Sequence, residues 1–134
     1  MSELKELAAE AKHELLTHII PFWRGMRDDK FGGYYGYLSY DLALDEKAEK
    51  GCILNSRITW FFANAYLLYK DGGISEEECE AAGFKGEDLL AEAKHGYEFL
   101  REHCIDKEYG GIFWSLNYDG TPLDTTKHTY NQAF

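Results

Sequence analysis

Among the side chains that can bind or transform a ligand, one arginine stands out because its surroundings are apolar. Arg57 lies within residues 53–69, ILNSRITWFFANAYLLY, which are apolar almost all round. A guanidinium in such a segment must pair with a carboxylate or face a wet cavity, because burying an unpaired charge is costly. Its planar fork of donors suits ligand oxygen atoms. The sequence therefore makes Arg57 a candidate binding residue, with a structural salt bridge as the alternative.

The histidines give a weaker signal. His13 and His18 are five residues apart, a spacing that does not put both on one face of an α-helix. His95 and His103 are eight apart and share a face, yet no nearby cysteine or acid completes a set of metal ligands. The sequence therefore predicts no metal site.

Paired carboxylates are the catalytic groups of many glycosidases. The acids that stand out here are Asp29, Asp41, Asp106 and Asp119, and all four occupy turn-like positions. An aspartate in a turn accepts hydrogen bonds from nearby backbone N–H groups. Turn formation is therefore the predicted role of each, rather than general acid or base catalysis.

Charge and composition limit the class of partner. The 134 residues carry 24 acidic and 14 basic side chains, a formal net charge of -10. Binding to nucleic acid needs a basic face, so no nucleic-acid partner is expected. An anionic membrane surface is disfavoured for the same reason, and no apolar run reaches the roughly 20 residues of a membrane span. The aromatic share of 16% fits a dense core or a cleft that stacks flat ligands such as sugar rings.

The cysteines and the N-terminus indicate a cytoplasmic protein. Cys52, Cys79 and Cys104 are odd in number and include no CxxC pair, which disfavours a disulfide framework. The first sixteen residues, MSELKELAAEAKHELL, are charged throughout and lack the apolar centre of a signal peptide. A reducing cytosol is the expected compartment.

Three helices have clear signatures. Residues 3–20 are amphipathic with one buried face, and Pro21 is expected to end that helix near Ile20. Residues 86–104 are amphipathic again. Ser75 and Glu78 have the spacing of a capping box, which predicts a short helix from Glu76.

Two further segments also favour helix. Residues 53–69 are too long for an unbroken strand, so they predict a helix that is buried on most sides. Residues 126–134 resume a helical pattern.

A similar phrase occurs twice between these helices. GGYYGYLSYD spans residues 32–41 and GGIFWSLNYD spans 110–119, and each alternates in β-favouring residues behind two glycines. The offset is 77 from Asp29 to Asp106 or 78 from Gly32 to Gly110, as if one residue were inserted. Such a recurrence indicates a repeated supersecondary unit. The expected fold is all-α, an α/α toroid with short β-hairpin excursions around 33–40 and 111–118 on one rim.

Five stretches in order resemble the N-acylglucosamine 2-epimerase family, and within it most resemble the cellobiose 2-epimerases. They are IIPFW (19–23), DDKFGGYYGYLSYD (28–41), KGCILNSRITWFFANAY (50–66), YEFLREHCIDKEYGGIFWSLNYDG (97–120) and KHTYNQAF (127–134). The resemblance covers nearly the whole chain. Residues 71–86 fit poorly and look like a loop insertion.

The resemblance implies an (α/α)6 barrel. Family chains are much longer, so it also implies that residues 1–134 form the N-terminal portion of a single barrel domain that is truncated here. Family members use two histidines as an acid–base pair, and both come from the later part of the barrel. None of the five histidines present is therefore expected to be catalytic.

The implied reaction is epimerisation at C2 of a reducing sugar, which interconverts glucose and mannose through an enediolate without a metal or organic cofactor. The resemblance assigns Arg57, in the NSR-x-x-W motif, to the reacting centre as the catalytic residue. It places Tyr130 and Gln132 near the sugar. Trp114 and Tyr37 are expected at the mouth of the site, although a packing role is equally expected for each. Asn55, from the NSR-x-x-W motif, is expected to bind the substrate.

Other hypotheses stay open. One is a free-standing half-toroid that binds a sugar or a protein without catalysis, and another is a toroid glycosidase with two carboxylates facing one cleft. The epimerase hypothesis predicts that residues 1–134 alone are inactive, because both acid–base histidines lie outside them. They are also expected to self-associate through Trp60, Phe61, Phe62 and Tyr66, on a flank of the inner helix that lacks a neighbour.

Overall fold

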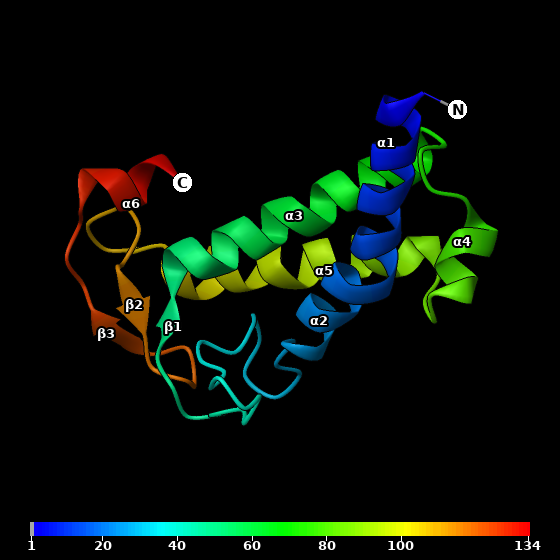
Figure 1. The fold of residues 1–134 in the computed structure, drawn as a ribbon. Helices are drawn as coiled ribbons and strands as arrows, with labels where there is room; N and C mark the ends of the chain where they lie inside the picture. The colour runs from blue at the N-terminus through cyan, green and yellow to red at the C-terminus, as the bar shows by residue number, and fades with distance from the viewer. Residues whose placement is uncertain (1) are drawn as a thin grey trace.

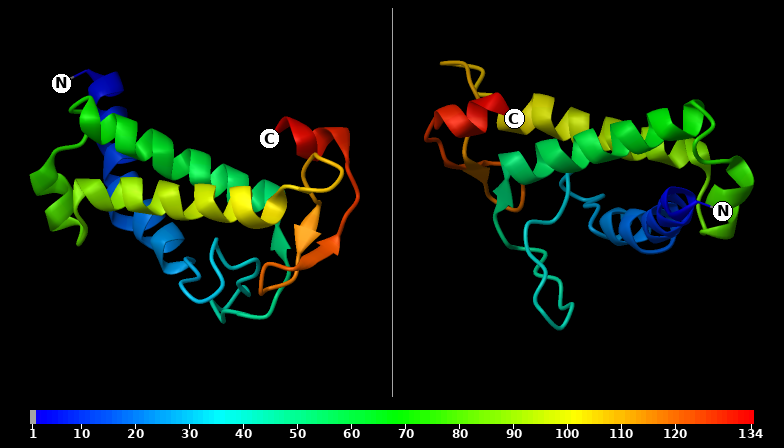
Figure 2. Two further views of the ribbon diagram at one scale, coloured as in Figure 1. Left: turned by 180° about the vertical axis from the view of Figure 1, so that it is seen from behind. Right: turned by 45° about the horizontal axis from the view of Figure 1, so that its top comes forward.

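The computed structural model describes residues 2–134 and is mostly helical, with one small sheet (Figure 1). Helices α3 (Cys52–Lys70) and α5 (Gly86–Phe99) lie side by side and antiparallel, and they make the most extensive contact of any two elements. Helices α1 (Glu3–Glu14) and α2 (Ile20–Gly25) cross one face of this pair (Figure 2). The pair forms the frame that carries the candidate site.

Pro21 does not end the first helix, as the sequence had suggested. The chain passes from α1 through a π-helical turn, η1 (Leu15–Ile19), directly into α2. Pro21 lies in the first turn of α2. Because the helix is continuous, the missing N–H of Pro21 leaves a gap in the ladder of backbone hydrogen bonds, and the π-helical turn that precedes it is where that ladder changes register.

The predicted buried face of α1 is also wrong. No residue of α1 is buried, and Leu4 and Leu7 are 77% and 63% exposed. An ion pair of 2.6 Å between Lys12 and Glu78 ties the end of α1 to α4 (Glu76–Ala81). Periodicity identifies which side chains share a stripe, whereas burial requires another element to cover that stripe.

Helix α3 is buried on one face rather than on most sides. Ile58 and Phe62 are 3% and 0% exposed and belong to the main core between α2, α3 and α5. On the opposite face, Trp60 and Leu67 are 69% and 56% exposed. Arg57 is exposed with them, which corrects its expected burial. The predicted uncovered flank therefore includes Trp60 but not Phe62.

The capping box is confirmed at the start of α4. The Ser75 hydroxyl accepts the N–H of Glu78 at 3.2 Å, and the Glu78 carboxylate accepts the N–H of Ser75 at 2.8 Å. Residues 71–86, which looked like a loop insertion, thus hold a short helix.

Helix α5 continues through a π-helical turn, η2 (Leu100–Cys104), and α6 (Thr129–Ala133) follows the sheet.

The sheet has three short antiparallel strands in the order β1 (Lys50–Gly51), β2 (Ser115–Leu116) and β3 (Pro122–Asp124). The β2–β3 hairpin confirms the β-excursion predicted for the second phrase. Residues 33–40 of the first phrase form isolated bridges instead of a strand. Alternation favours an extended backbone, but a strand also needs a partner of sufficient length.

Both phrases lie at the same end of the α3–α5 pair, as predicted. The aromatic rings of Phe31 and Tyr118 are 5.4 Å apart in a T-shaped arrangement, which joins the two loops directly. The N-terminus lies near α4 at the opposite end (Figure 1). Among the described residues, no helix is both long and apolar enough to cross a bilayer.

Candidate functional site

The start of α3 is fixed by a loop that we call the first corner, residues 28–34 together with Lys50 and Asn55. The Lys50 ammonium donates to Asp28 Oδ2 at 2.5 Å and to the carbonyl of Gly32 at 2.8 Å. Asn55 Oδ1 accepts the N–H of Tyr34 at 2.8 Å. The side chains of Lys50 and Asp28 are 0% and 1% exposed. The first corner is therefore a buried ion pair that locks the loop to the first turns of α3.

The same arrangement recurs in a second corner, residues 106–112 together with Lys127 and Gln132. The Lys127 ammonium donates to Asp106 Oδ2 at 2.7 Å and to the carbonyl of Gly110 at 2.8 Å. Gln132 Oε1 accepts the N–H of Ile112 at 2.7 Å. Each bond matches one in the first corner, so the repeated phrase is a repeated hydrogen-bonded device.

The structural match corrects the alignment of the two phrases. Asp28, rather than Asp29, is the counterpart of Asp106, because each accepts two backbone N–H groups of its own turn through Oδ1. The aspartates and the glycines are thus both offset by 78, with no insertion between them. The offset falls to 77 at the lysines, Lys50 and Lys127, and is also 77 between Asn55 and Gln132.

Electrostatics stabilise both corners. Burial alone raises the pKa of Asp28, but the Lys50 ammonium and two backbone N–H groups outweigh it, so the pKa lies below the usual value. The Lys127 ammonium, helped by the N–H of Tyr109, lowers the pKa of Asp106. Both aspartates are therefore charged partners of their lysines at neutral pH.

Arg57 lies two residues after Asn55 in α3 and borders two hollows. One, of about 310 Å³, is lined by Ser56, Arg57, Trp60, Ala133 and Phe134. The other, of about 550 Å³, is lined by Trp23, Ile53, Leu54, Arg57, Ile58, Trp60 and Phe61. The guanidinium and the Trp60 ring are common to both. This wall combines a cation with flat apolar surfaces, a combination that suits a ligand with both oxygen atoms and a flat carbon face.

Tyr130 reaches this wall through Phe134. The Arg57 guanidinium lies over the Phe134 ring at 5.8 Å, and the rings of Phe134 and Tyr130 are 5.0 Å apart. Tyr130 is 62% exposed. The structure therefore brings Arg57 and Tyr130 to one region, together with Trp60 and Phe134. Trp60 is three positions after Arg57, a spacing that places both on one helix face.

The other predicted site residues lie elsewhere or serve the backbone. Asn55 is 0% exposed, and its amide also donates to the carbonyl of Gly51 at 3.1 Å. The Gln132 amide accepts the backbone N–H of Ile112 and donates to the carbonyl of the same residue. Trp114 packs edge-on against His128 at 4.9 Å, and Tyr37 is 55% exposed on the first loop. The structure does not bring these four side chains to the Arg57 wall.

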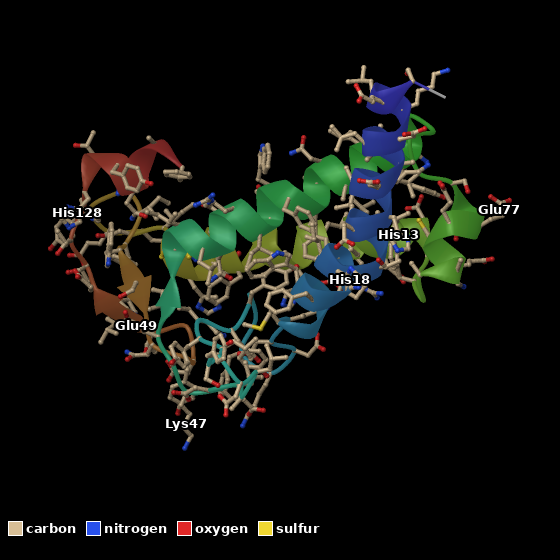
Figure 3. The ribbon with its side chains drawn as sticks, viewed as in Figure 1. His13, His18, Lys47, Glu49, Glu77 and His128 are labelled. Carbon is tan, nitrogen blue, oxygen red and sulfur yellow. The ribbon has the colours of Figure 1, made fainter. Side chains whose placement is uncertain are left out.

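The histidines make local contacts. His13 and His18 lie close together, with ring centroids 6.4 Å apart (Figure 3), because η1 is a π turn and brings residues five apart to one face. This corrects the view that their spacing separates them. His128 lies at the opposite end of the molecule in that view. His95 bonds the carbonyl of Gly33 at 2.8 Å, and His103 bonds that of Gly120 at 3.2 Å.

The turn aspartates behave as predicted in most cases. Asp41 accepts the Ser39 hydroxyl at 2.6 Å, and Asp119 accepts the N–H of Thr121 at 3.1 Å. Asp29 instead pairs with Arg27 at 2.6 Å. Across residues 2–134, no group of three His, Cys, Asp or Glu side chains is arranged to hold a metal ion.

Sequence reasoning missed one polar cluster. Glu92 of α5 is 5% exposed and lies between Arg24 and Arg27 at 3.4 and 3.3 Å. It also accepts the hydroxyl of Tyr34 at 3.2 Å. Burial, followed by the Glu92 charge, raises the pKa of Tyr34. Because each charge has a partner, the cluster joins α2 to α5 and leaves no cation free for a ligand.

Comparison with known proteins gives consistent matches. A family model described as N-acylglucosamine 2-epimerase (GlcNAc 2-epimerase) matches residues 33–134. A cellobiose 2-epimerase of Ruminococcus albus is 51% identical over 128 residues, which cover 96% of this chain and 29% of the relative.

Solved structures agree with the sequence comparison. A sugar epimerase from a ruminal bacterium has a TM-score of 0.79 at 50% identity and is matched over 93% of this chain and 28% of its own. The cellobiose 2-epimerase of Bacillus thermoamylovorans has a TM-score of 0.83 at 39% identity, over 96% and 29%. The chain thus spans less than a third of the length of these proteins.

Proposed function

Because the chain belongs to the N-acylglucosamine 2-epimerase family, we propose that it is part of a carbohydrate 2-epimerase that acts on cellobiose. The enzyme would interconvert glucose and mannose at the reducing end of the disaccharide. The observation that carries this proposal is the family match, which includes Arg57 and the second corner. The high identity to a cellobiose 2-epimerase supports the choice of disaccharide.

The chemistry assigns a specific role to Arg57. Epimerisation requires an open sugar, removal of the C2 proton next to the C1 carbonyl, and return of a proton to the other face. The enediolate formed between these steps carries negative charge on its oxygen atoms. A preorganised guanidinium next to them stabilises that charge more than it stabilises the ground state. Arg57 is exposed beside the two hollows, where a sugar can reach it.

Aromatic side chains would hold the sugar against this cation. We propose that Tyr130, with Trp60 and Phe134, provides the apolar side of the site. Trp114 and Tyr37 would lie farther out, towards the mouth. Gln132 and Asn55 act indirectly in this scheme, since their amides fix the backbone from which the binding side chains project.

The acid and the base are proposed to come from residues outside this sequence. No histidine of residues 2–134 lines either hollow beside Arg57. His18, His95 and His103 are engaged with Glu14, Gly33 and Gly120 respectively. Two histidines from the rest of the enzyme would flank C2, with no metal or organic cofactor.

The proposed architecture is an (α/α)6 barrel, of which residues 1–134 form the N-terminal portion of a single domain. The repeated corners support a ring of helical hairpins, since each corner joins an outer helix to an inner one. In that ring α3 and α6 are inner helices, while α1, α2 and α5 lie outside.

The test uses the whole protein that contains residues 1–134. Incubation with cellobiose should yield the disaccharide with mannose at its reducing end, detected by chromatography. Glucose and N-acetylglucosamine, assayed in parallel, determine whether the enzyme prefers the disaccharide. Absence of a 2-epimer from all three sugars would refute the proposed activity.

A further inference from the structure

The π-helical turn η1 places two histidines side by side on the surface. In a regular α-helix, residues five apart point about 140° away from each other, since each residue turns the chain by about 100°. In η1 the N–H of Ile20 instead donates to the carbonyl of Leu15, five residues back, so the wider turn brings residue i+5 above residue i. The ring centroids of His13 and His18 are accordingly 6.4 Å apart (Figure 3). Both side chains are exposed to solvent.

The hydrogen bonds of His18 determine which of its ring nitrogens carries the proton. Nδ1 lies 2.8 Å from Glu14 Oε2, and a carboxylate oxygen can only accept. Nδ1 also lies 3.4 Å from Thr17 Oγ1, whose own hydrogen is donated to the carbonyl of His13 at 2.7 Å. Nδ1 is therefore the donor, which leaves the lone pair of a neutral His18 ring on Nε2.

This arrangement is the one that metal-binding histidines usually have. A histidine ligand commonly donates one ring N–H to a carboxylate, which orients the ring and makes the other nitrogen a better ligand. Glu14 holds His18 in this way, and the His18 side chain is 66% exposed, so an ion can reach Nε2 from solvent.

The separation of the two rings fits one shared ion. A ring nitrogen binds zinc at about 2.0–2.1 Å, which puts the ring centre about 3.2 Å from the ion. In a tetrahedral arrangement, the centres of two such rings are about 5.2 Å apart. The observed 6.4 Å exceeds that value by about 1 Å, which small rotations of two exposed side chains can supply.

We propose that His13 and His18 form a surface site for a divalent transition-metal ion of the class that prefers imidazole ligands, Zn²⁺, Ni²⁺ or Cu²⁺. Glu14 is a positioning residue of this site. Water completes the coordination shell, since within residues 2–134 no third His, Cys, Asp or Glu joins the pair. The bound ion would connect the last turn of α1 to η1 and so stabilise the π turn.

The charges around the two rings are compatible with a cation. Lys12, the neighbour of His13 in sequence, is paired with Glu78 at 2.6 Å. Glu14 adds a negative charge, and the whole chain has a formal net charge of -10. No residue of η1 lines either hollow beside Arg57. The inference is therefore independent of the proposed sugar chemistry.

The experiment measures Zn²⁺ binding by the whole protein that contains residues 1–134, after a chelator has removed any metal. Competition with a chromophoric chelator gives the stoichiometry and the affinity. The test variants are His13→Gln and His18→Gln. The matched control is His128→Gln, which changes an exposed histidine at the opposite end of the molecule (Figure 3). Circular dichroism verifies that every variant is folded.

Each test variant should bind one Zn²⁺ fewer than the parent, or bind that ion at least about tenfold more weakly, because half of the protein ligands are lost. Glu14→Ala should weaken binding by about tenfold, since losing the carboxylate behind a histidine ligand typically costs about 10–100-fold. Zinc should raise the unfolding temperature of the parent more than that of His13→Gln, because an ion that binds only the folded state stabilises it.

The control His128→Gln should match the parent in stoichiometry, in affinity and in the zinc-induced rise of the unfolding temperature. Equal zinc binding by the parent and both test variants overturns the proposal. A loss in only one of the two test variants would mean that the histidines do not share an ion, and it overturns the proposal as well. An equal loss in His128→Gln would show non-specific binding to surface histidines, with the same consequence.

Discussion

Asn55 and Gln132 make the same contact 77 residues apart: each side-chain oxygen accepts the backbone N–H that follows a Gly-Gly pair, at 2.8 and 2.7 Å. Each amide lies in the first turns of a helix that leads away from its corner. The contact therefore fixes the angle at which loop and helix meet. In the first unit, that helix carries Arg57 two residues later.

Lys50→Met should destabilise the chain far more than Lys127→Met. The first change leaves Asp28 charged and buried without its partner, which costs about 3–5 kcal/mol. The second leaves Asp106 with access to water, so a much smaller loss is expected. Urea unfolding of the two variants and the parent measures the difference. Equal urea midpoints for the two variants would contradict the prediction that the buried pair contributes more to stability than the partly exposed pair.

Gly33→Ala should cost more stability than Gly72→Ala. Both glycines have positive φ, 66° and 78°, so alanine strains each backbone by about 1–2 kcal/mol. Only at Gly33 does the new Cβ also meet other atoms, Asn55 Oδ1 and the Phe99 ring, both at 2.6 Å. This overpacking adds about 1–3 kcal/mol. Thermal unfolding of the two variants measures the additional loss of stability caused by crowding at Gly33. Equal losses of stability would show that the atoms around Gly33 move to accommodate the new Cβ.

Stability should fall as the pH drops below the usual range of aspartate. The pKa of Asp28 is lowered in the folded state, so its contribution is complete above the ordinary value of 3.8 and is lost as the pH falls through the folded pKa. Carboxyl-carbon NMR titration should give a midpoint for Asp28 below 3.8. A midpoint above that value would mean that burial outweighs the lysine.

Residues 1–134 alone should self-associate through the open face of α3. Trp60 and Leu67 are 69% and 56% exposed there, and each large apolar side chain left in water forgoes roughly 1.5–3 kcal/mol of burial. Sedimentation velocity should show a coefficient that rises with concentration. Trp60→Ser should reduce the effect, and Leu123→Ser, an exposed residue of β3, should not. A monomer at every concentration would refute this expectation.

The sequence was informative wherever a residue's role is local. The capping box of Ser75 and the turn role of Asp119 follow from chemistry within a few residues. The repeated Gly-Gly phrase correctly predicted that both loops lie at the same end of the helices, because segments of similar sequence adopt similar turns. Helix α3 was recognised from the length of its apolar run.

Features that depend on distant partners were missed. No local pattern indicates that Lys50 pairs with Asp28 across 22 residues, or that Glu92 lies between two arginines of α2 and its following turn. The exposure of Arg57 depends on which helices cover α3, and hydrophobicity alone does not specify that. The π turn that brings His13 close to His18 likewise has no signature in the spacing of the apolar residues.

Proton exchange at C2 tests most directly whether Arg57 stabilises an enediolate. The whole protein is incubated with cellobiose in deuterated water, and NMR follows deuterium at C2. Arg57→Ala should slow exchange by about 10²–10³ while changing stability little, since the side chain is exposed. Arg57→Lys should also be slow, because a point charge does not replace the planar fork. Arg101→Ala, another exposed arginine, should exchange at the parent rate. Exchange at the parent rate in Arg57→Ala would contradict the account.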